Sequence, residues 1–325
     1  MDITIFAGKG GVGKSTCAGA YSVRKASEGK VLAIDYDAGH SLDKVLALEK
    51  GARFSFNNTN EVVDSGIDNL LVGFVDSHYF LPIAEVKARM EEGDDEWNIQ
   101  KYLKQFEEDY GLLPLCDMVT TFYGIPTPIN DVSNFATLIN MYHKARALDV
   151  EDMVIDVEPT AGFKRLIESI GSITKSMRNL KDKNWKTKIA LMGMPDIKAF
   201  TEGEFIRDCD KYAKRIQEVM DEINKSRFYI VGLPEESPVS QMNEVYRMTN
   251  FIRGGSVDGF VVNNIRGEPH EAVQIARVKD KYSNHAVIEL GHDLRLCGSD
   301  QEQRRQALYE AGDEIVTNSK TVSTF

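Results

Sequence analysis

The sequence predicts an α/β fold, a doubly wound and mostly parallel β-sheet with helices on both faces. Most expected strands are short apolar runs that do not alternate with polar residues, which is typical of parallel strands covered on both faces. Segments with helical periodicity separate these runs, so strands and helices alternate along the chain. The expected strands lie at about residues 2–7, 31–36, 70–75, 152–157, 227–233, 257–263 and 286–290.

A glycine-rich segment follows the first expected strand and opens the first expected helix, at 15–26. It contains the pattern G-x-x-x-x-G-K-[ST], which in this strand–loop–helix context forms a phosphate-binding loop, the P-loop. Its backbone N–H groups surround a polyphosphate, and the helix dipole adds positive potential there. The expected nucleotide-binding residues of this loop are Gly8, Lys9, Gly10, Gly11, Val12, Gly13, Lys14, Ser15 and Thr16.

Two side chains of the loop have specific expected roles. Lys14 should reach the β- and γ-phosphates of a nucleotide, and the Ser15 hydroxyl should ligate Mg²⁺. The alternative is a glycine-rich turn without a ligand.

The chain has 325 residues, which exceeds a typical domain, but α/β folds of this length often form one domain with insertions. Two stretches, 79–147 and 163–225, are too long for simple crossovers between strands, and both are interpreted as helical additions. An apolar stripe at helical spacing runs through 163–180. That stripe either packs onto the sheet or forms a groove for apolar clients, where flexible methionines adapt to varied partners.

The net charge of the chain and the positions of its cysteines indicate which binding partners and which cellular compartment to expect. A formal net charge of −11 argues against nucleic-acid binding, which needs a basic patch. No apolar run approaches the roughly 18 residues of an integral membrane span, and the first strand leaves no room for a signal peptide. The cysteines lie far apart, which fits a reducing compartment, so we expect a cytoplasmic protein. They are Cys17, Cys116, Cys209 and Cys297.

Carboxylates follow two of the expected strands. Asp35 and Asp37 come at the end of the second strand, where a carboxylate can position or deprotonate an attacking water or can cap the next helix. Asp156 closes an apolar strand, the arrangement that holds Mg²⁺ through water in P-loop enzymes. Glu158, two residues later, is either a second candidate base or a partner for a nearby cation.

With Lys9 near its start, the loop resembles the deviant Walker A loop of one group of P-loop ATPases. This group includes the MinD and ParA proteins, nitrogenase iron protein, and the ArsA and tail-anchored-protein targeting ATPases. The resemblance implies that Lys9 reaches across a dimer interface and supplies a cation to the phosphoryl group on the partner's nucleotide, as an arginine finger does. A solvated loop lysine is the alternative.

The segment after the second strand is similar to switch I of the ArsA and tail-anchored targeting ATPases, Asp-Pro-Ala-His-(Asn/Ser)-Leu. Asp37, His40 and Leu42 match this pattern, while Ala38 and Gly39 replace Pro-Ala. The Asp of the family activates water, so the resemblance implies that role for Asp37. The additional carboxylate two residues earlier gives an Asp-x-Asp pattern that is more like MinD.

Two later segments carry the resemblance further. Asp156, Pro159 and Thr160 match the switch II pattern Asp-Thr-Ala-Pro-Thr-Gly-His-Thr, which implies a metal-linked role for Asp156. Asn263 matches the Asn of the family's Val-Asn-Gln, which reads adenine. The second adenine contact would come from 290–293, where the prolines of the family are missing.

The resemblance spans about residues 1–300 and implies an ATPase that uses ATP and Mg²⁺ and works as a homodimer, with Lys9 and Asp37 as catalytic residues. We therefore expect one P-loop ATPase domain over 1–325 with helical insertions. ATP would clamp two subunits together, and hydrolysis would release a protein client such as a hydrophobic membrane segment. The zinc and arsenite-binding cysteines of the family are absent. The alternatives are a MinD/ParA-type positioning ATPase, a metal-cluster maturation ATPase, and a nucleotide-switched binding module with little turnover.

Overall fold

The computed structural model describes residues 1–36, 41–49, 61–75, 129–157, 214, 217–253 and 257–320. Several residues singled out from the sequence lie outside this described part of the chain. They are Asp37, Ala38, Gly39, His40, Glu158, Pro159, Thr160 and the apolar stripe at 163–180.

The described strands form one eight-stranded sheet in the order β3-β4-β2-β5-β1-β6-β7-β8. All neighbouring strands are parallel except β3 and β4, which form an antiparallel pair at one edge. The doubly wound, mostly parallel fold predicted from the sequence is therefore confirmed. The strands are β1 (Asp2–Gly8), β2 (Val31–Tyr36), β3 (Val62–Ile67), β4 (Leu70–Phe74), β5 (Asp152–Val157), β6 (Arg227–Gly232), β7 (Gly259–Ile265) and β8 (Ala286–Gly291).

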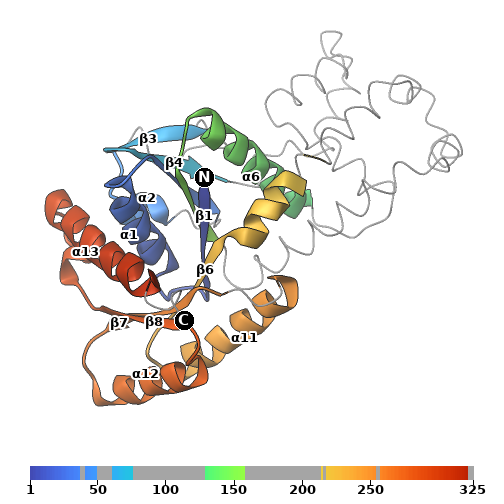
Figure 1. Cartoon of the computed structure of the whole chain (residues 1–325). Coiled ribbons are helices and arrows are strands. Elements are labelled where there is room, and N and C mark those ends of the chain that lie inside the picture. Colours follow the sequence, from blue (N-terminus) through green and yellow to red (C-terminus); the bar gives the residue numbers. More distant parts are fainter. Residues whose placement is uncertain are drawn as a thin grey trace, which may run out of the picture. The chain divides into compact units, whose positions relative to one another are not determined.

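Helices lie between most consecutive described strands, as Figure 1 shows, whereas β4 directly follows β3. None of the described helices combines the length and the apolar composition needed to cross a bilayer. The described helical elements are α1 (Lys14–Ala26), α2 (Leu42–Val45), α6 (Ile129–Ala147), α11 (Glu236–Arg253), α12 (Pro269–Lys281), the 3₁₀ turn η3 (Leu294–Cys297) and α13 (Gln301–Lys320).

Different helices cover the two faces of the sheet. Phe260 and Val261 are consecutive residues of β7 and therefore point to opposite faces. Val261 belongs to a buried cluster with Cys17 of α1 and Leu308 of α13, whereas the Phe260 ring lies 5.6 Å from that of Tyr246 in α11. Thus α1 and α13 pack on one face, and α11 packs on the other, where it contacts α12.

The chain divides into two compact units. The first comprises 1–76, 141–164 and 223–325 and contains the sheet. The second comprises 77–140 and 165–222, of which the structure describes only 129–140, 214 and 217–222. The expectation of one domain with two helical insertions stays a prediction.

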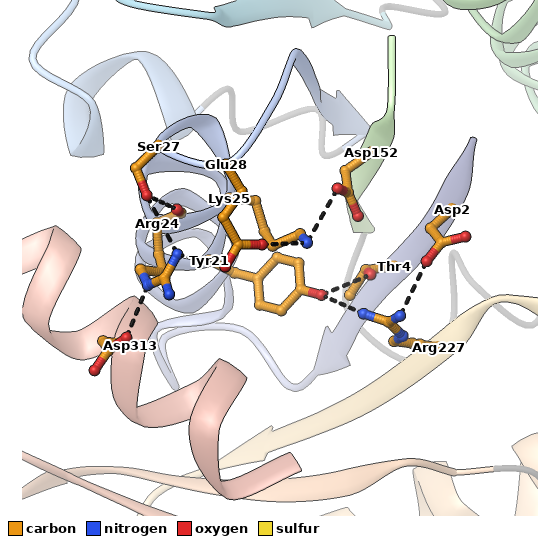
Figure 2. Close-up of polar contacts among 10 residues, drawn as sticks. All are labelled: Asp2, Thr4, Tyr21, Arg24, Lys25, Ser27, Glu28, Asp152, Arg227 and Asp313. Atoms are coloured by element: carbon orange, nitrogen blue, oxygen red, sulfur yellow. Dashed lines mark hydrogen bonds and ion pairs between the residues drawn. The ribbon is translucent and has the colours of Figure 1, made fainter. Parts of the chain in front are cut away.

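Polar contacts tie the end of α1 to the amino ends of the strands (Figure 2). The Arg227 guanidinium, at the start of β6, donates to the Tyr21 hydroxyl at 3.0 Å and pairs with Asp2 at 2.9 Å. Lys25 forms an ion pair with Asp152, the first residue of β5, at 3.2 Å. Because α1 is fixed at this edge of the sheet, its other end, which carries the glycine-rich loop, is also held in place.

Helix α13 packs closely along α1. The Arg24 guanidinium of α1 donates to Asp313 at 2.7 Å and lies 5.4 Å from the centre of the Tyr309 ring. Where the helices meet, a Cβ on Gly312 would overlap the main-chain oxygen of Ala20. The close approach therefore depends on a residue without a side chain. Neither α13 nor the edge strand β3 is among the elements expected from the sequence.

Candidate nucleotide-binding site

The glycine-rich loop joins β1 to α1 at the carboxyl edge of the parallel strands. Gly13 is the N-cap of α1 and has a φ of 88°, in the left-handed region that disfavours side chains. A Cβ there would also overlap the side-chain amide of Asn263. The loop is exposed from Lys9 to Gly11, whereas Val12 is buried against the core. The sequence thus forms a backbone concavity at a helix N-terminus, which is suited to an anion.

Two hydroxyl groups meet directly behind this loop. The Oγ atoms of Ser15, in the first turn of α1, and of Ser41, just before α2, lie 2.6 Å apart. Ser15 is 9% exposed and Lys14 is 5% exposed. Both predicted phosphate and metal contacts are therefore largely shielded at the base of the loop.

Buried carboxylates lie at the ends of two neighbouring strands. Asp35 of β2 and Asp156 of β5 are register partners, and both are fully buried. The main-chain N–H of Leu42 donates to Asp35 Oδ2 at 3.0 Å, which links the start of α2 to β2. Asp35 therefore orients the segment that carries Ser41, whereas its companion Asp37 lies outside the described residues.

Two charged groups beneath the loop affect the pKa of the Cys17 thiol. Burial raises its pKa, the negative charge of Asp156 raises it further, and the positive charge of Lys14 opposes both effects. One carboxylate and one ammonium group therefore act on the same buried atom. The structure thus brings Lys14 and Asp156, which are distant in the sequence, to one site.

A cavity of about 370 Å³ opens beside the first turns of α1. Its walls come from α1, the ends of β7 and β8, the η3 turn and α13. The Asn263 amide at its rim donates to the main-chain oxygen of Val12 at 3.0 Å. The lining residues are Thr16, Cys17, Ala20, Asn263, Glu289, Leu290, Gly291, His292, Asp293, Leu296, Ala307, Glu310, Ala311 and Glu314. Asn263 and residues 290–293, the two segments predicted to contact adenine, therefore line the same cavity.

An ion-pair network braces the outer wall of this cavity. Arg295 of η3 bonds with Asp293 at 2.6 Å and with Glu310 of α13 at 2.5 Å. Hydrogen bonding from Arg295 lowers the pKa of Asp293, with burial opposing it, so this carboxyl stays ionised at neutral pH. The network joins the loop after β8 to α13, and the sequence analysis did not identify it.

A second anchor, also missed from the sequence, fixes the loop after β7. One oxygen of Glu271 accepts hydrogen bonds from the main-chain N–H groups of Arg266, Gly267 and Glu268, at 2.8–2.9 Å. Glu271 occupies the third position of α12 and completes a capping box with Glu268. The sequence signal for this motif is a Glu three residues after a Glu-Pro helix start.

The fold and this arrangement of loop, hydroxyls and carboxylates define a P-loop nucleoside triphosphatase. A solved structure of a provisionally named plasmid partition protein from Borrelia burgdorferi B31, bound to AMPPNP, has a similar fold, with a TM-score of 0.51 and 13% identity over 98% of this chain and 97% of that one. The MinC:MinD cell division complex of Aquifex aeolicus is 12% identical, with a TM-score of 0.49, over 100% of this chain and 97% of that chain.

The family model for anion-transporting ATPases, the ArsA ATPases, matches residues 1–290, and the chain belongs to this family. A provisionally named arsenical pump-driving ATPase 2 of Aquifex aeolicus (strain VF5) is 25% identical over 278 residues, which cover 82% of this chain and 81% of that protein. The protein is accordingly an ATPase with a nucleotide-binding P-loop.

Proposed function

We propose that this ATPase hydrolyses Mg²⁺-ATP as a homodimer and uses the cycle to capture and release a protein client. The observation that carries the proposal is the 2.6 Å contact between the Ser15 and Ser41 hydroxyls, together with the carboxylates Asp35 and Asp156, which are register partners at the ends of neighbouring strands. Hydroxyl and carboxylate oxygens are the donors that Mg²⁺ prefers. The same contact joins the loop to the segment that resembles switch I.

Different residues around the loop would bind the phosphates and the metal ion. Lys14 and the loop N–H groups would hold the phosphates, and the Ser15 hydroxyl and the Asp156 carboxylate would hold Mg²⁺. When bound, Mg²⁺ neutralises charge on the phosphate oxygens. The largely buried positions of Lys14 and Ser15 keep bulk water away from these contacts, which strengthens their electrostatic effect.

The two proposed catalytic residues, Lys9 and Asp37, differ in their structural positions. Lys9 is exposed at the start of the loop, so it is available to a nucleotide held by a second subunit. Asp37 follows β2 and would position the attacking water. Asn263 and 290–293, which line the cavity, would hold the adenine base.

A protein client is favoured over a metalloid ion, because the arsenite-binding cysteines of the family are absent from the sequence. Soft metalloids bind thiolates, and the buried Cys17 has a raised pKa, so it stays protonated. Cys297 is exposed and is the other cysteine in the described part of the chain. The dispersed cysteines support a reducing compartment, such as the cytoplasm, as the site where the ATPase works.

Turnover and subunit mass together test this proposal. Wild-type protein should release phosphate from ATP only with Mg²⁺, and light scattering should show a dimer with AMPPNP and Mg²⁺ but a monomer without nucleotide. Lys14→Ala is the matched control and should remain monomeric. A monomer under all conditions, together with normal turnover, would disprove the dimer clamp; absence of turnover would disprove the hydrolytic role.

Pull-down with an Asp37→Asn variant and ATP should retain the client, and a variant that retains no protein would count against client capture.

A further inference from the structure

Arg304, near the start of α13, joins two segments from distant parts of the chain. Its Nη1 donates to the main-chain oxygen of Lys44 at 3.0 Å, and its Nη2 donates to the main-chain oxygen of Gly298. The side chain is half-buried, and the planar guanidinium suits two acceptors at once. Both acceptors are main-chain atoms, so the contact fixes the backbone of each segment.

The first segment is α2, beside the phosphate loop. Its first residue, Leu42, donates its N–H to Asp35, and Ser41, just before it, contacts Ser15. Since α2 has only four residues, about one helical turn, a shift of Lys44 also moves Leu42 and the adjoining Ser41. The position of Lys44 therefore affects the distance between the Ser41 and Ser15 hydroxyls.

The second segment is the wall of the cavity. Gly298 caps the end of η3, and Asp293 caps its start by accepting from the N–H of Arg295. Asp293 and Leu296 line the cavity directly. Any ligand that orders η3 therefore also orders the Gly298 carbonyl that Arg304 holds.

We propose that Arg304 is a positioning residue for ATP hydrolysis, which couples the cavity wall to α2 and thus to the hydroxyl beside Ser15. This inference rests on the proposed function, in which the cavity holds the base and Ser15 lies at the metal. The described contacts of Arg304 are to carbonyl groups and not to the P-loop. Its loss should therefore affect the chemical step more than binding, since displacements of about 1 Å can cost up to about 100-fold in rate.

The test compares substitutions at two adjacent arginines of α13. Arg304→Met removes the guanidinium, Arg304→Lys keeps the charge without the fork, and Arg305→Met is the control. Arg305 is also half-buried but lines a separate cavity with Val23 and Asn69. At saturating ATP, kcat should fall about 10-fold in Arg304→Met with KM changed less than about 3-fold, and Arg304→Lys should recover only part of the loss. Arg305→Met should stay within about 2-fold of the wild type.

Hydrogen exchange separates positioning from a general loss of structure. With AMPPNP and Mg²⁺, amides 42–46 should exchange faster in Arg304→Met than in the wild type, while amides of α1 stay equally protected. Wild-type kcat in Arg304→Met, an equal loss in Arg305→Met, or unchanged exchange at 42–46 would each overturn the inference. Failure of the wild type to hydrolyse Mg²⁺-ATP would instead overturn the proposed function, and the inference with it.

Discussion

The side-chain amide of Asn263 donates a hydrogen bond to the main-chain oxygen of Val12 across 3.0 Å, although 251 positions separate the two residues in the chain. This bond links the end of β7 to the glycine-rich loop. Gly13 allows it, because any side chain at that position would occupy the space of the Asn263 amide. The residue matched to the adenine contact therefore also supports the loop that holds the phosphates.

Substitution of Asn263 should weaken ATP binding through this support. A neutral hydrogen bond contributes about 0.5–1.5 kcal/mol, so Asn263→Ser should raise the Kd for ATP by about 2- to 13-fold. Asn263→Asp should raise it further, because a carboxylate repels both the Val12 carbonyl and the phosphates. Titration calorimetry with ATP and with tripolyphosphate tests the role of the loop. If the substitution weakened the binding of ATP but not of tripolyphosphate, Asn263 would contact the adenine base and would not support the phosphate loop.

The parts of the site that are local in sequence could be predicted, and the parts that join distant segments could not. The loop at 8–16 and the strand ends at Asp35 and Asp156 follow from contiguous motifs. The contact of Arg304 with the Lys44 carbonyl, by contrast, spans 260 positions of the chain, and nothing local in the sequence signals it.

The missed elements of the fold have physical reasons as well. Among the described strands, β3 pairs only with β4, in the antiparallel sense, and most of its residues are partly or fully exposed. It therefore lacks the continuous apolar run that identified the buried parallel strands. Helix α13 follows the last expected strand, and its packing partner α1 lies at the other end of the sequence.

The two loop lysines should give different kinetic defects. Lys14 is buried at the base of the loop, so Lys14→Ala should raise the Kd for ATP. Lys9 is exposed, so Lys9→Ala should leave the Kd within about 3-fold and lower kcat by about 10³-fold or more, the effect of an arginine finger. Equal turnover in the wild type and in Lys9→Ala would refute the role of Lys9 in the partner's site.

Gly312→Ala should destabilise the fold despite the better helix propensity of alanine. The propensity gain is at most about 1 kcal/mol, whereas overpacking against the main-chain oxygen of Ala20 costs about 1–3 kcal/mol. We expect a net loss in the free energy of unfolding, measured by urea denaturation. Gly298→Ala is the control, because a Cβ there meets only an ordinary contact, and its effect should stay within about 0.5 kcal/mol.

Glu271 should make stability depend on pH in acid. Burial opposes ionisation of its carboxyl, but hydrogen bonds from the N–H groups of Glu268, Arg266 and Gly267 outweigh it and lower the pKa below the ordinary 4.5. The ionised form therefore contributes stability above pH 4.5, and this contribution is lost as pH falls through the lowered pKa. Glu271→Gln should have a lower free energy of unfolding than the wild type at pH 7. This difference should shrink below pH 4.5, as Glu271 of the wild type becomes protonated. A gap that stays constant between pH 7 and pH 3 would contradict the assignment.

The two carboxylates after β2 should separate into a structural and a catalytic residue. Asp35 is fully buried and accepts the N–H of Leu42, so Asp35→Asn should lower the free energy of unfolding by about 1–3 kcal/mol. If Asp37 positions the attacking water, Asp37→Asn should bind Mg²⁺-ATP normally but hydrolyse it about 10²–10⁴-fold more slowly, with unchanged stability. Urea denaturation and single-turnover hydrolysis, measured on both variants and on Glu158→Gln, distinguish these effects. An active Asp37→Asn beside a folded but inactive Asp35→Asn would transfer the catalytic role to Asp35, and an inactive Glu158→Gln would transfer it to Glu158.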